Sequence, residues 1–197
     1  MKKRWTTALI TLAIAGVATT AIGDGQLRIS MGADRINSEL PASEANAVQE
    51  LVNKLGGFTT YDRKSGRMTV EKPKVNILIL EGIQQSRNKN IVFTNPIKSY
   101  TDKDVPRSFG VFVEVDQAPE ARQLEMKLVL IGPNGKEVEE GNKLTYSTKN
   151  GTSFYFSQPF ISTKLSQFGT YKVQLLMRSE KYKDYVVVGE NSFTVGR

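Results

Sequence analysis

Short strand-forming runs, separated by turn residues, follow one another from residue 75 almost to the end of the chain. Each run is rich in β-branched or aromatic residues and is bounded by residues that favour turns. Pro133-Asn134-Gly135 is one such turn, because proline fixes φ and Asn-Gly accepts a positive φ. The predicted strands are Val75–Glu81, Asn90–Thr94, Ser108–Gln117, Gln123–Ile131, Thr152–Phe156, Thr170–Arg178 and Tyr185–Val195.

Two details of these runs indicate which β architecture the chain adopts. In Ser108–Gln117 every second residue is large and apolar, which is typical of a strand with one buried face. Those residues are Phe109, Val111, Val113 and Val115. Gly169 followed by Tyr171 resembles the tyrosine corner, in which the phenol hydroxyl bonds upstream backbone. Together, the runs predict a mostly β fold: an immunoglobulin-like antiparallel β-sandwich over residues 73–197, preceded by a small α+β module.

The preceding module, residues 24–72, mixes periodicities. A strand is predicted around Leu27, Ile29 and Met31, which alternate with polar residues. A helix follows, with Ser43 as its N-cap, and Gly56 and Gly57 end it. Its predicted apolar stripe consists of Ala47, Val48, Leu51, Val52 and Leu55. The runs "FTTYD" and "RMTVEK" then predict a hairpin with Gly66 at its turn.

This segment resembles the copper amine oxidase N-terminal-like domain over about residues 27–72. The residues that carry the resemblance are Leu51, Leu55-Gly56, Tyr61-Asp62, Gly66 and Thr69-Val70. The aromatic, Val, Pro and Arg that usually precede the helix in that family are reduced here to Pro41. The resemblance implies a non-catalytic appendage, of a kind common in secreted and surface proteins of Gram-positive bacteria.

The first 23 residues predict export. "MKKR" is a positively charged start, Trp5–Gly23 is uncharged, and small residues precede Asp24, as in a secretory signal peptide. An uncleaved anchor helix is the alternative, because 19 uncharged residues approach the length that spans a bilayer. We therefore expect a secreted or cell-surface protein that touches the membrane only through this segment, if the segment is not cleaved.

The composition excludes several kinds of chemistry. The chain has no cysteine and no histidine, so thiol nucleophiles, Ser-His-Asp triads and sites built on thiolate or imidazole are absent. The net charge of +7 falls to +4 without Lys2, Lys3 and Arg4, and no basic cluster remains that predicts nucleic-acid binding. We expect no cofactor and no enzymatic activity.

The carboxylates suggest no site of their own. Asp102 and Asp104 could ligate a hard cation, but calcium needs more oxygen ligands than this pair offers, and no metal site is predicted. Glu139 and Glu140 lie in a predicted polar connector. Neighbours on an extended chain point to opposite sides, so these two do not form an acid–base pair.

The loop Arg178–Val186 is the predicted partner-binding site. It joins the last two predicted strands at one end of the sandwich, where loops often bind partners. Cationic groups and flat aromatic faces suit an anionic cell-wall polymer or another protein. The residues proposed for this contact are Arg178, Lys181, Tyr182, Lys183 and Tyr185. The sequence thus predicts a non-enzymatic exported binding or structural protein. The alternative is a secreted regulator, such as a proteinase inhibitor acting through sandwich loops.

Overall fold

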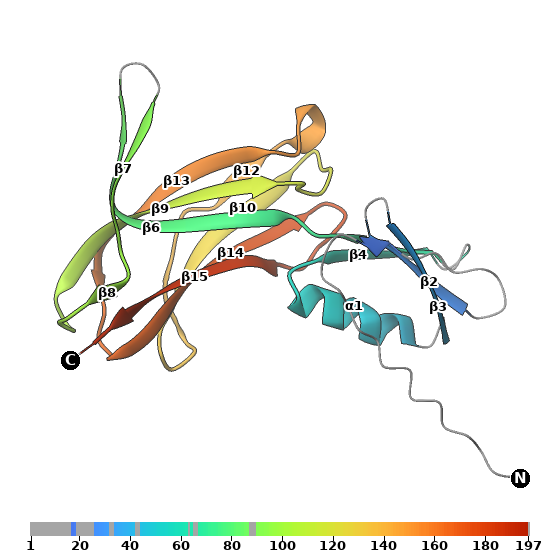
Figure 1. Ribbon diagram of the computed structural model, residues 1–197, viewed down its shortest axis with the longest axis horizontal. Helices are drawn as coiled ribbons and strands as arrows, with labels where there is room; N and C mark the ends of the chain where they lie inside the picture. The colour runs from blue at the N-terminus through green and yellow to red at the C-terminus, as the bar shows by residue number, and fades with distance from the viewer. Residues whose placement is uncertain are drawn as a thin grey trace, which may run out of the picture.

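The computed structural model describes residues 17–18, 26–31, 34–41, 44–62, 64, 67–86 and 90–196. A sheet with one helix forms the first part, and two longer sheets form the second part, which lies beyond one end of the first (Figure 1). The first part consists of β1 (Val17–Ala18), β2 (Gln26–Met31), β3 (Asp34–Pro41), α1 (Ala45–Lys54), β4 (Phe58–Asp62) and β5 (Arg67–Glu71).

The second part is an immunoglobulin-like β-sandwich. One sheet has the order β13-β9-β6-β7 and the other β11-β10-β14-β15-β8, with β12 paired to β10. Every pairing is antiparallel except that of the short strand β8, which runs parallel to β15. Its elements are β6 (Lys74–Gln85), β7 (Ile91–Pro96), β8 (Ser99–Tyr100), β9 (Pro106–Asp116), β10 (Leu124–Ile131), β11 (Glu137–Glu140), β12 (Leu144–Tyr146), the 3-10 turn Thr148–Asn150, β13 (Phe154–Lys164), β14 (Gly169–Ser179) and β15 (Val186–Val195).

The core lies between the two sheets and confirms the predicted alternation. Phe109, Val111, Val113 and Val115 of β9 are all at most 2% exposed. They pack in one cluster with inward residues of the opposite sheet, among them Leu128 and Leu175. The predicted tyrosine corner is also present, because the Tyr171 hydroxyl accepts the Gln167 N–H at 2.9 Å and bonds the Gln167 carbonyl at 3.1 Å.

The predicted turn at residues 133–135 closes the connection between β10 and β11. Gly135 has φ of +76° and donates its N–H to the Gly132 carbonyl, while the Asn134 side chain accepts the Lys136 N–H. The strand that follows was not expected. Glu137–Glu140 pairs with β10, although the sequence indicated a polar connector. Its single sheet neighbour explains the mixed polarity, since an edge strand keeps much of its surface in water.

Two other strands are much longer than expected. β6 continues beyond Glu81 to Gln85, and β13 continues beyond Phe156 to Lys164. The second half of β6 turns back through β7 and forms a hairpin that projects from the sandwich (Figure 1). Gly82 in β6 and Pro159 in β13 fall inside these strands and look like stops in the sequence, but both strands continue through them.

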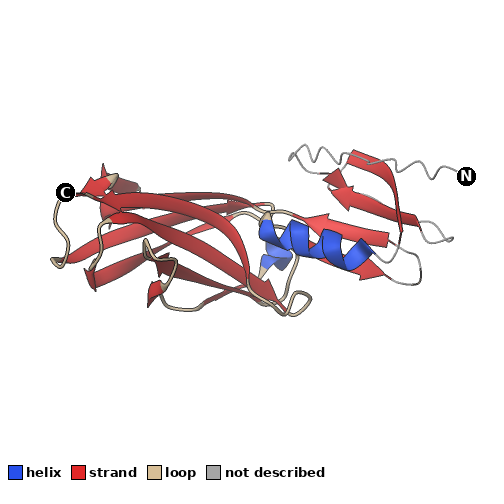
Figure 2. Cartoon of the chain, turned by 90° about the horizontal axis from the view of Figure 1, so that it is seen from below, coloured by secondary structure: helices blue, strands red, loops and turns tan. Residues whose placement is uncertain are grey.

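The first part forms one sheet of order β1-β3-β2-β5-β4 with α1 packed against it (Figure 2). The strand at β2 and the hairpin β4–β5 agree with the prediction, whereas β3 was missed. Because β3 pairs antiparallel with β2, the observed order within residues 24–72 is two strands, a helix and a hairpin. Ser43, the predicted N-cap, and Gly66, the predicted turn glycine, lie outside the described residues, and Glu44 occupies the N-cap position of the helix.

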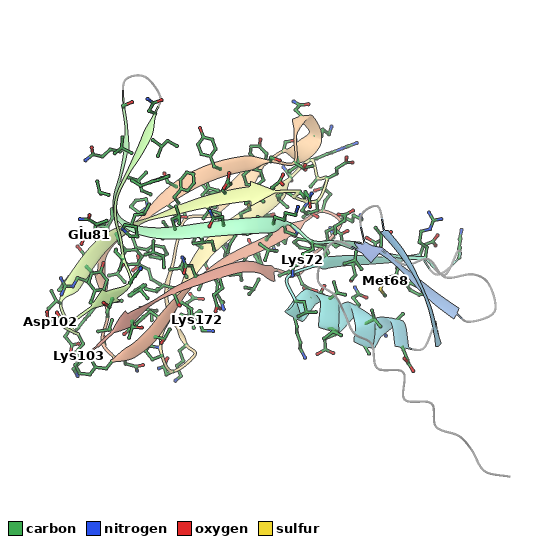
Figure 3. All side chains as sticks on the ribbon, viewed as in Figure 1. Met68, Lys72, Glu81, Asp102, Lys103 and Lys172 are labelled. Atoms are coloured by element: carbon green, nitrogen blue, oxygen red, sulfur yellow. The ribbon has the colours of Figure 1, made fainter. Side chains whose placement is uncertain are left out.

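The buried face of α1 is rotated from the predicted stripe. Ala45 and Val52 are buried against Met68 and Val70 of β5, with Val48 packed alongside; Met68 is seen between helix and sheet in Figure 3. Leu51, placed in the predicted stripe, is 47% exposed. Ala47, also in that stripe, is exposed as well.

The helix ends as predicted at glycine. Gly56 has φ of +79° and donates to the Asn53 carbonyl, and Gly57 donates to the Val52 carbonyl at 2.9 Å. This pair of backbone hydrogen bonds is the Schellman motif. The motif requires the left-handed conformation, which glycine adopts without a steric penalty.

Most of the predicted export segment, residues 1–23, lies outside the described residues. Its described residues, Val17 and Ala18, pair in parallel with Asp34 and Arg35 of β3. Among the helices that the structure describes, none has the length and apolar character needed to cross a membrane.

Candidate binding surfaces

The predicted binding loop lies between β14 and β15, at the end of the sandwich that faces the first module. Its Tyr182 is only 8% exposed, and its ring centroid lies 4.8 Å from that of Phe58 in β4. The hydroxyl donates to Glu71 Oε2 at 3.0 Å and lies 3.1 Å from Thr60 Oγ1. The expectation of an open aromatic face at Tyr182 is therefore wrong, because the first module covers it.

Lys181 joins the same contact. Its Nζ is 3.0 Å from Glu71 Oε1 and lies 4.9 Å from the centroid of the Tyr182 ring. Burial works to lower the pKa of Lys181, but hydrogen bonds to Tyr182 and Glu71 outweigh it and raise that pKa. Burial is also the main reason why the pKa of the Tyr182 phenol is raised. Both residues thus hold the module on the sandwich.

Arg178 and Tyr185 lie together on the outer face of the β10–β14 pair. Arg178 donates from Nε and Nη2 to Glu125 Oε2 at 3.0 and 2.7 Å, and its guanidinium lies 4.6 Å from the Tyr185 ring centroid. The hydrogen bond from Arg178 is the main cause of the lowered pKa of Glu125. Lys127 Nζ lies 4.9 Å from the same ring centroid. Lys183 is simply exposed. The five predicted residues therefore do not form one site. Lys181 and Tyr182 contact the first module, Arg178 and Tyr185 interact with Glu125, and Lys183 is in solvent.

A different surface, missed by the sequence prediction, covers the outer face of the β13-β9-β6-β7 sheet. Three aromatic residues from three strands lie next to one another there. The Phe112 ring centroid lies 4.8 Å from that of Phe93 and 5.7 Å from that of Tyr155. Tyr155 is 61% exposed and Phe93 is 41% exposed, while Phe112 is half-buried between them. We call these three residues the aromatic row.

Beside the aromatic row, strands β6 and β9 separate. Their pairing runs from Lys74↔Asp116 to Leu80↔Gly110 and then stops. Beyond Leu80, β6 pairs with β7 as far as Gln85↔Ile91, whereas β9 continues along β13 as far as Pro106↔Lys164. The two inner strands thus form a fork, which we call the β6–β9 fork.

The fork contains a hollow of about 310 Å³. The side chain of Ile83 lies over Gly110, since a Cβ added at Gly110 would be 2.9 Å from Ile83 Cδ1. Pro159 and Ile161 of β13 line the other side, and Ile161 is 69% exposed. Glu81, Ser108, Ser157 and Gln158 also line the hollow, so its walls are part apolar and part polar, and it is open to solvent.

Carboxylates flank this surface. Glu114 pairs in register with Tyr155 at one end, and Glu81 lies at the base of the projecting hairpin at the other end (Figure 3). Glu81 Oε2 accepts a hydrogen bond from Asn95 Nδ2 at 2.7 Å. Between Glu114 and Glu81, the outward positions of β6, β9 and β13 carry no lysine or arginine among the described residues.

The remaining acidic candidates are engaged in ordinary surface contacts. Asp102 lies 3.6 Å from Arg107, and Asp104 lies 3.8 Å from Lys164. Glu139 accepts from Thr163, and Glu140 pairs with Lys127. In the described part of the chain, no group of three or more acidic side chains is placed to hold a metal ion.

One signal in the sequence could have revealed the aromatic row. In a sandwich strand the outward positions are usually polar, yet "FYFSQPFI" in β13 has apolar or aromatic residues in both alternating sets. Likewise, Phe112 occupies an outward position of β9 between inward-facing valines. Such departures from alternation indicate a surface with a function.

Comparisons with known proteins identify no family. No family model matches the sequence, and no curated protein matches it. In a β-glucuronidase 2 from Bacteroides uniformis, 13% of that chain aligns with 60% of this one at 17% identity and a TM-score of 0.41. An immunoglobulin-like protein from Pseudomonas aeruginosa aligns over 96% of its length with 63% of this chain, at 13% identity and a TM-score of 0.30.

A CARDB domain from Pyrococcus furiosus, solved in complex with di-metal ions, gives similar values. It aligns over 96% of its length with 64% of this chain, at 10% identity and a TM-score of 0.31. The immunoglobulin-like description stands on the strand order, the parallel β8–β15 pair and the tyrosine corner of the chain itself.

Proposed function

We propose that this chain is a non-enzymatic binding or structural component exported to the cell surface or cell wall, and that it meets its partner through the aromatic row and the β6–β9 fork. The observation that carries the proposal is the exposure of three large apolar or aromatic residues, Tyr155, Phe93 and Ile161, on the outer face of one sheet. Contiguous exposed apolar surface on a soluble domain marks an interaction site, because leaving it in water costs free energy.

Two features support a role without catalysis. The chain has neither histidine nor cysteine, so the bases that usually activate nucleophiles are missing. Its surface carboxylates pair with cations or hydroxyls, as Glu125 does with Arg178 and Glu139 with Thr163.

Export rests on the sequence of the first 23 residues, and the Gram-positive origin rests on the resemblance of residues 27–72 to the copper amine oxidase N-terminal-like domain. The observed arrangement of that segment supports the idea of an appendage. Its hairpin docks on the loop between β14 and β15 through Phe58 and Glu71. This docking leaves the outer face of the β13-β9-β6-β7 sheet free for a partner.

The test combines fractionation with retention. We expect the chain in the secreted or wall fraction, and we expect the purified full chain to be retained on cell envelopes from its own source. The double variant Tyr155→Ser with Phe93→Ser should lose most of this retention. The matched control is Tyr146→Ser, because Tyr146 is also exposed, at 37%, but belongs to the other sheet.

Three results would contradict the proposal. They are a chain confined to the cytoplasm, retention that the double variant leaves unchanged, and inhibition of a proteinase without any envelope retention. The last result would favour the secreted regulator instead.

A further inference from the structure

We infer that the β6–β9 fork binds an extended peptide segment of a partner protein, which adds a strand to the free edge of β6 and places an apolar side chain in the hollow beside Ile83. The inference rests on the proposed binding function and names the partner class for the same surface. It follows from the backbone edge, the shape of the hollow and the nearby charges.

The first observation is an unpaired backbone edge. A strand inside a sheet has neighbours on both sides, but beyond Leu80 the strand β6 is paired with β7 alone. On the opposite side of the fork, Arg107 and Phe109 of β9 pair with β13. Among the described residues, no strand pairs with Glu81–Gln85 on the side that faces β9. Such an edge is the usual template for strand addition by an extended peptide.

The second observation is the hollow next to this edge. In a bound strand, side chains alternate, so every second one points toward the sheet face. Here that side chain would meet the apolar part of the lining, formed by Ile83, Pro159 and Ile161, next to a polar part that includes Glu81 and Gln158. A volume of about 310 Å³ exceeds what one Val, Leu or Ile side chain needs, and the hollow can accept such a group without moving the strands. Recognition by edge plus pocket is how strand-adding domains combine affinity with specificity.

The third observation is charge. The chain as a whole is basic, with a net charge of +7, but the surface between Glu114 and Glu81 is flanked by carboxylates and has no cation among its described outward positions. Arg107, on the β9 side of the fork, belongs to the inward set of β9 and lies 3.6 Å from Asp102. Charge complementarity across an interface favours a partner of opposite sign. The segment that fits is therefore apolar at alternate positions and basic at others.

The ring geometry disfavours a glycan as the main ligand. Stacking on a sugar chain needs open ring faces in a common plane. The Phe112 ring is tilted by 59° against Phe93 and by 32° against Tyr155, and it is half-buried between them. The three rings of the aromatic row thus pack against one another. They are better suited to form an apolar wall beside a peptide than to stack on a sugar chain.

The experiment uses a phage-displayed library of random dodecapeptides, selected on the immobilised full-length chain. We expect enriched sequences in which apolar residues alternate with Lys or Arg. A synthetic peptide from this selection should bind at least tenfold more weakly to Ile161→Lys than to the unchanged chain. Val138→Lys is the control, because Val138 is 40% exposed on β11 of the other sheet, and its affinity should stay within twofold.

Two further measurements separate the backbone edge from the charge. N-methylation of one of the two alternating sets of peptide nitrogens should abolish binding, because only every second N–H of a strand points to the edge with which it pairs. Methylation of the other set should be tolerated. Glu114→Lys should weaken binding severalfold, since it replaces an exposed carboxylate at the end of the aromatic row. Urea midpoints of the three variants confirm that each is folded.

The inference is overturned if no sequence is enriched, if Ile161→Lys binds as tightly as Val138→Lys, or if peptides methylated on either of the two alternating sets of nitrogens all bind normally. Binding of neutral glycans at this face, sensitive to Ile161→Lys while peptides are not, also overturns it. Envelope retention that disappears in the Tyr155→Ser, Phe93→Ser variant would then still support the proposed function, so the two failures are distinguishable.

Discussion

Two surfaces of the sandwich present similar residues to very different surroundings. The loop between β14 and β15 carries Tyr182, which is 8% exposed, and the outer face of β13 carries Tyr155, which is 61% exposed. At the loop, ring and hydroxyl contact Phe58 and Glu71 of the first module. At β13, the ring contacts only Phe112 of its own sheet among the ring pairs of the described chain.

The difference teaches that a residue's role depends on what else reaches its end of the fold. An aromatic, cationic loop at the end of a sandwich is typical of a binding site when that end is free. Here another part of the same chain occupies that end, so the groups that would bind a partner bind the module. The open face is where strand alternation is broken by Phe112 and Tyr155.

Replacing Tyr182 with Ala should separate the two surfaces most clearly. We expect it to lower the free energy of unfolding by about 3 kcal/mol, since it removes a buried aromatic ring. Tyr155→Ala should change that free energy by about 0.5 kcal/mol or less, because its ring is mostly exposed. Urea unfolding of both variants makes the comparison, and equal losses would show that the two tyrosines do not differ.

Gly56→Ala tests how closely the module approaches β15. An added Cβ would lie 2.9 Å from the Val187 carbonyl oxygen, and φ is +79°. We expect a loss of about 2 kcal/mol, from backbone strain plus displacement of the contact. Gly135→Ala is the matched control: φ is +76°, but nothing lies within 4 Å of the added atom. Its cost should be about 1 kcal/mol, and a cost equal to that of Gly56→Ala would argue against close docking.

Tyr171→Phe tests the tyrosine corner of the sandwich. The change removes the two hydrogen bonds between the hydroxyl and Gln167 while keeping the ring in the core. We expect a loss of about 1 kcal/mol in the free energy of unfolding. Tyr155→Phe should be neutral by the same measurement. An unaffected Tyr171→Phe variant would reject the corner.

The smallest expected effect is on alkaline stability. Burial raises the pKa of Tyr182, so the folded chain keeps this proton where the unfolded chain has lost it. The resulting stability is fully present below the ordinary tyrosine pKa of about 10 and is lost as the pH rises through the folded value. Unfolding free energies measured from pH 8 to 11 should therefore fall more steeply for the unchanged chain than for Tyr182→Phe. Parallel curves would mean that Tyr182 titrates as in water.

The sequence predicted the sandwich well because its signals are local. The alternation of Phe109 to Val115 and the spacing of Gly169 and Tyr171 each reflect a single strand or corner. The end of the helix at Gly56 could also be predicted, since a helix end in the left-handed conformation favours glycine. The stripe of α1 was misplaced because burial of Ala45 and exposure of Leu51 depend on which side meets β5.

The site could not be predicted in the same way. Whether Tyr182 is open depends on the docking of Phe58, Thr60 and Glu71, more than 100 positions away in the chain. The β6–β9 fork exists because the pairing of β6 with β9 ends at Leu80. The point at which two strands stop pairing depends on both strands, so no local sequence pattern predicts it. The apolar outward residues of β13 were visible in the sequence, but their meaning required the register with β9.

The most direct measurement is nitration of the folded chain with tetranitromethane, followed by peptide mapping, because the reagent modifies accessible phenols. Tyr155, 61% exposed, should be nitrated early, whereas Tyr182, 8% exposed and bonded to Glu71, should be modified only after unfolding. Early nitration of Tyr182 together with protection of Tyr155 would contradict the assignment of these two surfaces.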